Sequence, residues 1–447
     1  MAGLSEPKRH IVRQLVERAP ESVLKLLDGA FAGPGKAEEI RTMIALERRD
    51  REARAAVYEP LLPMFAPARE EGVGVRFSPG LPATLWRLLA QRRPAVAAGV
   101  IRALRDRYDE MEPAPIALDV ACAASAALLR AEPEACGCTP DVAADLAAYM
   151  DLAPVARRAL PYLEEWLGRT TEERTVALRV LVQDAVAVAE DATPRLLEIL
   201  SGHLPEPFMV LRLVDLITDH GGEAFVAASE LGPLGERLIA DVECCAARFA
   251  ARARSAESAA TAAGGADLVW LTGALEAFRV SIETKQGGPW AGRLTAARTQ
   301  AVEALEARLN KVEAAVGKAL PMEKVRIAGS MTRPAPKVGE PPNPALVETA
   351  RAGLILLAAV RNTATALGCG SLRTKVAEAT AARIDNYAEE ALQMLNDDGP
   401  PGHAVTFAEL AADFLGLARD PDAARLVRRR IAAISARPTE TASQRVA

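Results

Sequence analysis

The chain has 447 residues, of which 50% are hydrophobic and 25% are charged, and its mean hydropathy is +0.06. This length and composition exclude a disordered chain, a protein built mainly of membrane spans and a small fold stapled by disulfides. Its 54 lysines and arginines and 59 acidic residues give a net charge of −5. No global field therefore attracts nucleic acid or anionic lipid, and any such binding has to be local.

The composition predicts an all-α, multi-helical fold. Only 4% of the residues are aromatic, and the apolar residues are mainly Ala, Leu and Val, a set rich in strong helix formers. The first helix is expected from Ser5 to Ala19, with one apolar face that docks on a core and is formed by Ile11, Val12, Leu15, Val16 and Ala19.

The chain shows no targeting or membrane signal. Charged residues interrupt the N-terminal stretch, and the apolar run 352–360 is about half of the ~20 residues that a spanning helix needs. We therefore expect a cytoplasmic protein that does not bind membranes.

Residues 113–250 have the pattern of short helices that are separated by turns and often begin at proline. Paired helices of this kind have the layout of an α-solenoid, although no sequence period typical of helical repeats is present. We expect either an irregular α-solenoid-like region or an irregular helical domain here, followed by a helical bundle or hairpin.

Two breaks interrupt the helical pattern. Residues 251–266 are small and polar, and 328–344 contain five prolines that bar a continuous helix or a central strand. The expected organisation is an N-terminal domain (1–250), a small and polar junction (251–266), a long amphipathic helical segment (267–327), a Pro-rich linker (328–344), a C-terminal helical domain (345–436) and a polar tail (437–447).

The strongest periodic pattern lies between these breaks. A seam of apolar residues with alternating spacings of three and four comprises Val302, Leu305, Leu309, Val312 and Val316. The seam predicts packing against another helix, most simply one from 345–395, or against a second copy or a partner protein. Because the seam spans barely two heptads, packing within the chain is the preferred alternative.

One polar cluster, Asp215, Asp219 and His220, precedes Gly221-Gly222. The two aspartates share a helix face, so with the imidazole they form a candidate metal or catalytic group. The preferred interpretation is structural, because a histidine near a helix C-terminus and a following glycine are common features of helix ends.

Other motifs do not assemble a recognisable active site. The six cysteines are too sparse for a disulfide framework, and Cys136-Gly137-Cys138 has no nearby histidine to complete a metal site. Gly33-Pro34-Gly35-Lys36 lacks the first glycine and the final Ser or Thr of a phosphate loop and predicts an interhelical turn. Motifs typical of zincins, di-iron carboxylate proteins and nucleophile-elbow hydrolases do not occur. We expect no cofactor.

A basic face is predicted on the last helix, formed by Arg425, Arg428 and Arg429. Because no aromatic residue lies between these arginines to stack on a base, pairing within the chain or an acidic protein partner is preferred over nucleic acid.

The leading functional hypothesis is a non-enzymatic helical scaffold or regulatory interaction protein. The alternative is an all-helical enzyme or small-ligand-binding protein with its pocket between helices, because catalytic residues can be scattered along a sequence. A DNA-associated regulator would need a basic recognition face, which only the last helix suggests.

Overall fold

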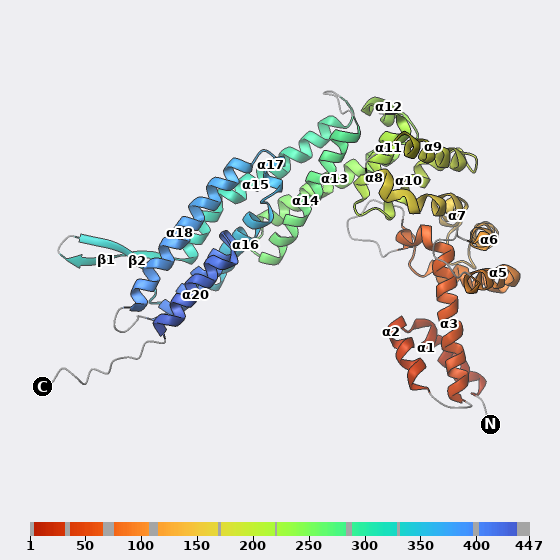
Figure 1. Cartoon of the computed structure of the whole chain (residues 1–447), viewed down its shortest axis with the longest axis horizontal. Helices are drawn as coiled ribbons and strands as arrows, with labels where there is room; N and C mark the ends of the chain where they lie inside the picture. Colours follow the sequence, from red (N-terminus) through yellow and green to blue (C-terminus); the bar gives the residue numbers. More distant parts are fainter. Residues whose placement is uncertain are drawn as a thin grey trace. The chain divides into compact units, whose positions relative to one another are not determined.

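The computed structural model describes residues 4–31, 36–65, 76–106, 115–168, 171–219, 221–282, 288–328, 331–396 and 402–435. Within these ranges every regular element is helical except for one two-stranded sheet (Figure 1), which confirms the all-α prediction. Contacts divide the chain into two compact units, residues 1–237 and 238–447.

The first unit is entirely helical in its described residues. Its α-helices are α1 (Glu6–Arg18), α2 (Glu21–Ala30), α3 (Lys36–Tyr58), α4 (Leu81–Arg92), α5 (Pro94–Arg105), α6 (Ile116–Ala131), α7 (Pro140–Ala159), α8 (Leu163–Leu167), α9 (Glu172–Val186), α10 (Ala192–Gly202), α11 (Val210–Thr218) and α12 (Glu223–Ala228). Short 3-10 helices are η1 (Glu59–Phe65), η2 (Leu160–Tyr162) and η3 (Pro207–Met209).

The first three helices enclose a small core of their own. Val16, Leu24 and Ile44, one from each helix, are buried together. Arg51 of α3 donates hydrogen bonds to the carbonyl oxygens of Val16 and Glu17, both at 3.1 Å, near the end of α1. The predicted apolar face is confirmed at Val16, whereas Ile11 and Leu15 are exposed, because the core formed with α2 and α3 covers only the side of α1 that carries Val12, Val16 and Ala19.

In the rest of the first unit, helices pack mainly on helices near them in sequence. The contacts join α4 to α5, α5 to α6, α6 to α7, and α10 to α7 and α9. Such neighbour packing is typical of α-solenoids, but these helices range from five residues in α8 to 20 in α7. The α-solenoid stays a prediction.

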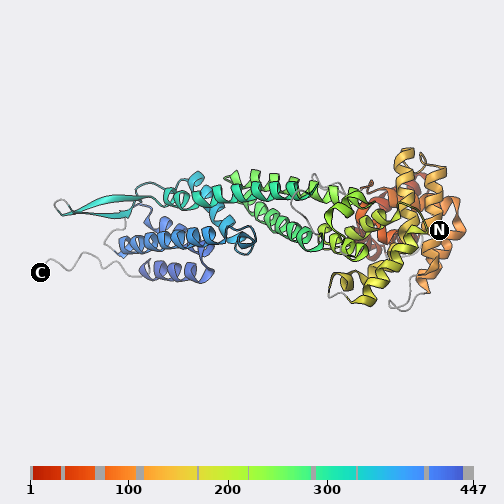
Figure 2. The same cartoon turned by 90° about the horizontal axis from the view of Figure 1, so that it is seen from above.

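The second unit is a set of long helices with one β-hairpin. Its elements are α13 (Gly232–Arg254), which crosses the boundary, α14 (Ser258–Ser281), α15 (Ala291–Ala319), β1 (Met322–Ala328), β2 (Met331–Pro336), α16 (Pro344–Ala359), α17 (Thr363–Ala366), α18 (Gly370–Asn396), α19 (Ala404–Ala418) and α20 (Pro421–Ser435). Helices α15 and α18 are in direct contact, and Figure 2 shows them side by side, α15 in teal and α18 in blue.

The apolar seam of α15 forms part of the core of this unit. Leu305, Leu309, Val312 and Val316 are buried, and Val302 is half-buried. The helix packs on α16 and α18, which lie within the range 345–395 apart from the first residue of α16 and the last residue of α18. At Gly353 of α16 an added Cβ would lie 3.2 Å from a methyl group of Val312. The seam therefore packs within the chain, as its short length predicted.

The small and polar segment 251–266 differs from the expected junction. Helix α13 continues to Arg254 and α14 begins at Ser258, so Gly264 and Gly265 lie inside a helix and are buried. An added Cβ at Gly265 would lie 2.6 Å from the Cβ of Ala359 in α16. These glycines let two helices approach closely. A glycine-rich composition fits both such a close contact and a flexible junction, so composition alone does not distinguish them.

The Pro-rich segment also differs from the expected spacer, because its first part belongs to a β-hairpin. Helix α15 ends at Ala319 before Pro321, and β1 then pairs antiparallel with β2. Pro334 and Pro336 are tolerated in β2 because a strand in a two-stranded sheet has a free edge, where a missing N–H costs no ladder hydrogen bond. The predicted polar tail, 437–447, lies outside the described residues.

Candidate functional site

The structure gives Asp219 a structural role. It ends α11 in the left-handed conformation with φ of 56°, and its backbone N–H donates to the carbonyl oxygen of Asp215. Its carboxylate pairs with Arg179 at 2.7 Å. His220 lies outside the described residues, so the proposed convergence of all three side chains stays a prediction. Within the described ranges, no group of three or more His, Cys, Asp or Glu is arranged to hold a metal ion.

The predicted basic face of α20 is exposed and is partly paired within the chain. Arg425 pairs with Asp422 at 2.8 Å, and Arg428 pairs with Asp413 of α19 at 2.5 Å. Arg429 is exposed. Two of the three arginines thus pair within the chain, which was one of the two expected alternatives, the other being an acidic protein partner. Exposed ion pairs of this kind contribute little stability.

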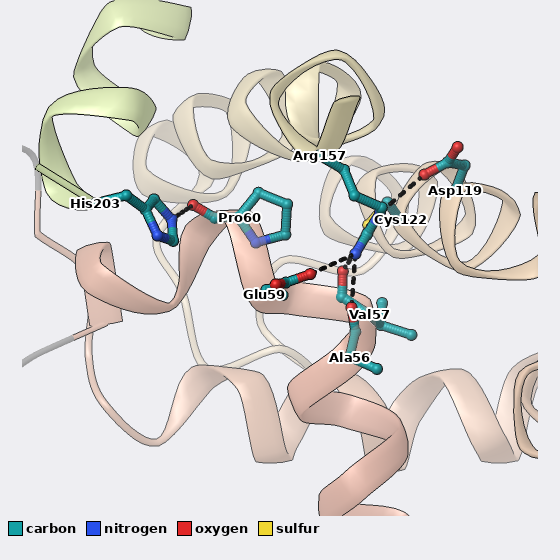
Figure 3. Close-up of polar contacts among 8 residues, drawn as sticks. All are labelled: Ala56, Val57, Glu59, Pro60, Asp119, Cys122, Arg157 and His203. Carbon is teal, nitrogen blue, oxygen red and sulfur yellow. Dashed lines mark hydrogen bonds and ion pairs between the residues drawn. The ribbon is translucent and has the colours of Figure 1, made fainter. Parts of the chain in front are cut away.

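The most buried cation of the first unit lies elsewhere, in α7. The side chain of Arg157 is only 4% exposed and donates hydrogen bonds of 2.7 Å to the carbonyl oxygens of Ala56 and Val57 in the last turn of α3 (Figure 3). Its Nε donates to Asp119 at 3.2 Å. Because the last carbonyls of a helix have no partner within it, Arg157 caps α3, and its role is structural.

A polar pocket of about 490 Å³ in the first unit is also internally paired. Arg195 bonds to Asp145 at 2.5 Å and to Asp191 at 2.9 Å, and its guanidinium carbon lies 5.1 Å from the ring centre of Tyr149. Tyr149 in turn donates to Glu198. Because the charged side chains that line this pocket pair with one another, they form a surface network of ion pairs. The pocket is therefore not the best candidate for a ligand site.

The best candidate site surrounds Arg308 of α15 in the second unit. Its Nε and Nη2 atoms are buried and have no hydrogen-bond partner among the described residues. Burial lowers the pKa of this guanidinium from its ordinary value. An unpaired buried charge is costly, so the position calls for an anion or for ordered water.

Two cavities adjoin this side chain. One, of about 510 Å³, lies between α13 and α15, and the other, of about 380 Å³, lies between α15 and α16. Arg308 and Lys311 line both of them. The two cavities are therefore separate spaces that share the same pair of cations.

The lining of each cavity includes cations and apolar surface, and the first cavity is also lined by Gln300 and the acidic residue Glu303. Arg254 adds a cation to the first cavity and Lys318 adds one to the second. The remaining lining of the second cavity consists of Val312, Ala314, Ala315, Leu346, Thr349 and Gly353. Its described lining thus carries three cations, apolar side chains and one hydroxyl, a set that suits an anion attached to an apolar group.

The sequence contained a signal for this site. Arg308, Lys311 and Lys318 are spaced by three and seven residues, which places them on one face of a helix beside the apolar seam. A basic flank of an amphipathic helix is usually just solvated. What singles out Arg308 is burial by neighbouring helices, which spacing does not show.

Comparisons with known proteins assign no relative. No family model, no curated protein and no solved structure matches the chain. Within the described residues, no helix is long and apolar enough to cross a membrane.

Proposed function

We propose that the protein is a non-enzymatic helical scaffold of the cytoplasm that binds an acidic protein segment at the two cavities flanking Arg308. The observation that carries this proposal is the pair of buried, unpaired nitrogen atoms on Arg308. A carboxylate bound there would supply charge-assisted hydrogen bonds, which are among the strongest in proteins.

The rest of the lining supports an acidic segment that also carries apolar side chains. Lys311 and Lys318 add positive charge, while Val312 and Leu346 offer apolar surface in the same cavity. An amphipathic helix with acidic and apolar residues three or four positions apart presents the matching chemistry on one face.

The first test asks whether Arg308 is held for a ligand or for stability. Arg308→Met removes a half-buried charge whose two buried nitrogen atoms have no hydrogen-bond partner, so the free energy of unfolding should stay equal or rise by about 1 to 3 kcal/mol. Arg373→Met is the matched control, because Arg373 is also half-buried but donates to the carbonyl oxygen of Leu357 at 3.3 Å. That control should be destabilised in urea denaturation. Destabilisation by Arg308→Met of the same size would argue for a structural role.

The second test measures binding. A synthetic helical peptide with glutamates beside leucines is titrated into the full-length chain by calorimetry. Arg308→Gln should weaken binding by about 10- to 100-fold, since a charge-assisted hydrogen bond contributes roughly 1.5 to 3 kcal/mol. Lys375→Gln, which removes an exposed cation of α18, should leave the affinity unchanged. Equal affinities of the wild type, Arg308→Gln and Lys375→Gln for the peptide would contradict the proposal.

A small-molecule ligand is the second candidate, favoured by the volume of the cavity between α15 and α16. At about 380 Å³, that cavity lies within the range of small-ligand sites. Native mass spectrometry of the purified chain distinguishes the two candidates, because a retained small anion would add a fixed mass that Arg308→Gln removes.

A further inference from the structure

One segment of the second unit carries a local excess of positive charge. Residues 308–337 contain seven cations and two acids, a net charge of +5 in a chain whose total is −5. Four of these cations, Lys324, Arg326, Arg333 and Lys337, lie on the β1–β2 hairpin or directly after it. They form a surface separate from the cavities at Arg308.

The hairpin projects from the helices of the second unit (Figures 1 and 2). Its base is anchored, because Ala335 and Pro336 are buried and β2 contacts α18. Beyond the base, 322–326 and 332–334 are exposed. All four cations are exposed, and none of them forms an ion pair with another described residue.

The strand register distributes these cations over both faces of the ribbon. Val325 lies opposite Arg333, and Lys324 lies opposite Pro334. Directly opposed residues point to the same face, and neighbours along a strand point to opposite faces. Lys324 and Arg326 therefore share one face, and Arg333 shares the other face with the acidic residue Glu323.

Cations on both faces limit the partners that would contact all of them. A flat anionic membrane would meet only one face of the ribbon at a time, and single exposed ion pairs with an acidic protein surface contribute little. A nucleic acid gains more, because each cation that neutralises a phosphate releases a condensed counterion.

The shape of the hairpin selects among nucleic acids. A two-stranded β-ribbon fits the major groove of B-form DNA, where phosphates line both walls. The major groove of an RNA duplex is too deep and narrow, and binding to single strands usually needs aromatic side chains, which the hairpin sequence lacks. We infer that the β1–β2 hairpin is an arm that binds the backbone of double-stranded DNA, with Lys324, Arg326, Arg333 and Lys337 contacting phosphates.

The net charge of the whole chain gave no reason to expect nucleic acid as a partner. This inference differs because the charge of the hairpin segment is opposite in sign to that of the whole chain. Its failure would leave the proposal for Arg308 untouched, since the two sites share no residue. A hairpin of two strands with both faces in water is itself only marginally stable, so an occupant would also order it.

The test measures binding of the full-length chain to a fluorescein-labelled DNA duplex of mixed sequence by fluorescence anisotropy over a series of salt concentrations. Four phosphate contacts predict a slope of about −3.6 in a plot of log K against log salt concentration. Lys324→Gln/Arg326→Gln should reduce this slope to about −1.8 and weaken binding at least tenfold at low salt. Lys8→Gln/Lys375→Gln removes the same charge from exposed helical positions and should keep the wild-type slope.

Three results would overturn the inference. These are no binding to the duplex at low salt, equal loss of affinity in both double variants, and tighter binding of the wild-type chain to phosphatidylserine vesicles or polyglutamate than to DNA at equal concentrations of negative charge. Circular dichroism of each variant checks that the helices are intact, so a loss of binding is assigned to the hairpin itself.

Discussion

Arg157 shows how one buried side chain joins three helices of the first unit. It extends from α7 to the last carbonyls of α3 and to Asp119 of α6, and beside it the Cys122 thiol donates to the carbonyl oxygen of Val57 at 3.2 Å. His203 makes a comparable contact, because its Nε2 lies 2.8 Å from the carbonyl oxygen of Pro60 in η1 (Figure 3). Side chains from distant segments thus form hydrogen bonds with the free backbone carbonyl oxygens at the end of α3 and in η1, which follows it.

Replacing Arg157 is expected to be severe. Arg157→Ala leaves the carbonyl of Ala56 and the carboxylate of Asp119 without this donor and the carbonyl of Val57 with only the Cys122 thiol, and it should lower the free energy of unfolding by about 3 to 5 kcal/mol. The neighbouring Arg158 is half exposed and pairs with Asp184 at 2.7 Å, so Arg158→Ala should cost less than about 1 kcal/mol. Urea denaturation monitored by circular dichroism compares them, and similar losses in both variants would refute the capping role.

Two buried thiols predict a loss of stability at alkaline pH. Burial raises the pKa of Cys122 and of Cys245 from the ordinary value of 9.0 to about 12. Below pH 9.0 these thiols are protonated in both states, so their stabilising effect is fully present. Above it they ionise only in the unfolded chain, and stability falls until pH passes the folded pKa.

At about one pH unit above 9.0, each thiol should have lowered the free energy of unfolding by about 1.4 kcal/mol. Urea denaturation near pH 8 and near pH 10 measures this loss. Cys122→Ala/Cys245→Ala should lose less stability between the two pH values than the wild type does. Cys244→Ala, which removes an exposed thiol, should behave like the wild type. An unchanged loss in the double variant would contradict the prediction.

At the scale of elements, α15 has two functions on two faces. One face carries the apolar seam that α16 and α18 cover, and the flank beside it carries Arg308, Lys311 and Lys318. The buried seam fixes the helix in place, and this rigid placement positions the cations beside the cavities.

Truncation of the seam tests this placement. Leu309 is fully buried, so Leu309→Ala should cost about 2 to 5 kcal/mol by leaving a cavity between α15 and its neighbours. Leu426→Ala on α20 is the control, because that side chain is 59% exposed and its truncation should cost little. Thermal melts followed by circular dichroism give the comparison. A seam that tolerated Leu309→Ala would not be core.

At the scale of the whole molecule, the boundary between the two compact units falls within α13, at Arg237 and Leu238. The sequence placed it near residue 250, where small and polar residues begin. The structure ties this end of α13 to α14, because Arg248 and Arg252 bond to Asp267 at 2.9 and 2.5 Å, and the Cys245 thiol donates to its carbonyl oxygen at 3.3 Å.

Two fragments test where the C-terminal unit begins. A fragment of residues 229–447 contains all of α13 and should unfold cooperatively on heating. A fragment of residues 251–447 lacks the buried Cys245 and Phe249, and a buried side chain as large as that of Phe249 alone contributes about 1.5 to 3 kcal/mol. Its melting temperature should therefore be clearly lower. Equal melting temperatures would support the boundary that the sequence suggested.

The sequence by itself determined what local periodicity specifies. Its composition predicted an all-helical fold, and the spacing of the apolar residues from 302 to 316 predicted a helix with a buried seam, because a helix repeats every 3.6 residues and places such residues on one face. It also indicated chain breaks at prolines, although it did not show that Pro334 and Pro336 would lie in a strand.

Only the tertiary structure decided the roles that depend on distant residues. Arg157 caps carbonyls 100 and 101 residues away, Gly265 lets Ala359 approach closely, and neighbouring helices bury two nitrogen atoms of the Arg308 guanidinium. In the sequence, Arg157 and Arg308 resemble the many solvated arginines of this chain, and Gly265 resembles a residue of a flexible junction. Burial and pairing are set by packing between segments far apart in sequence, and local spacing carries no information about them.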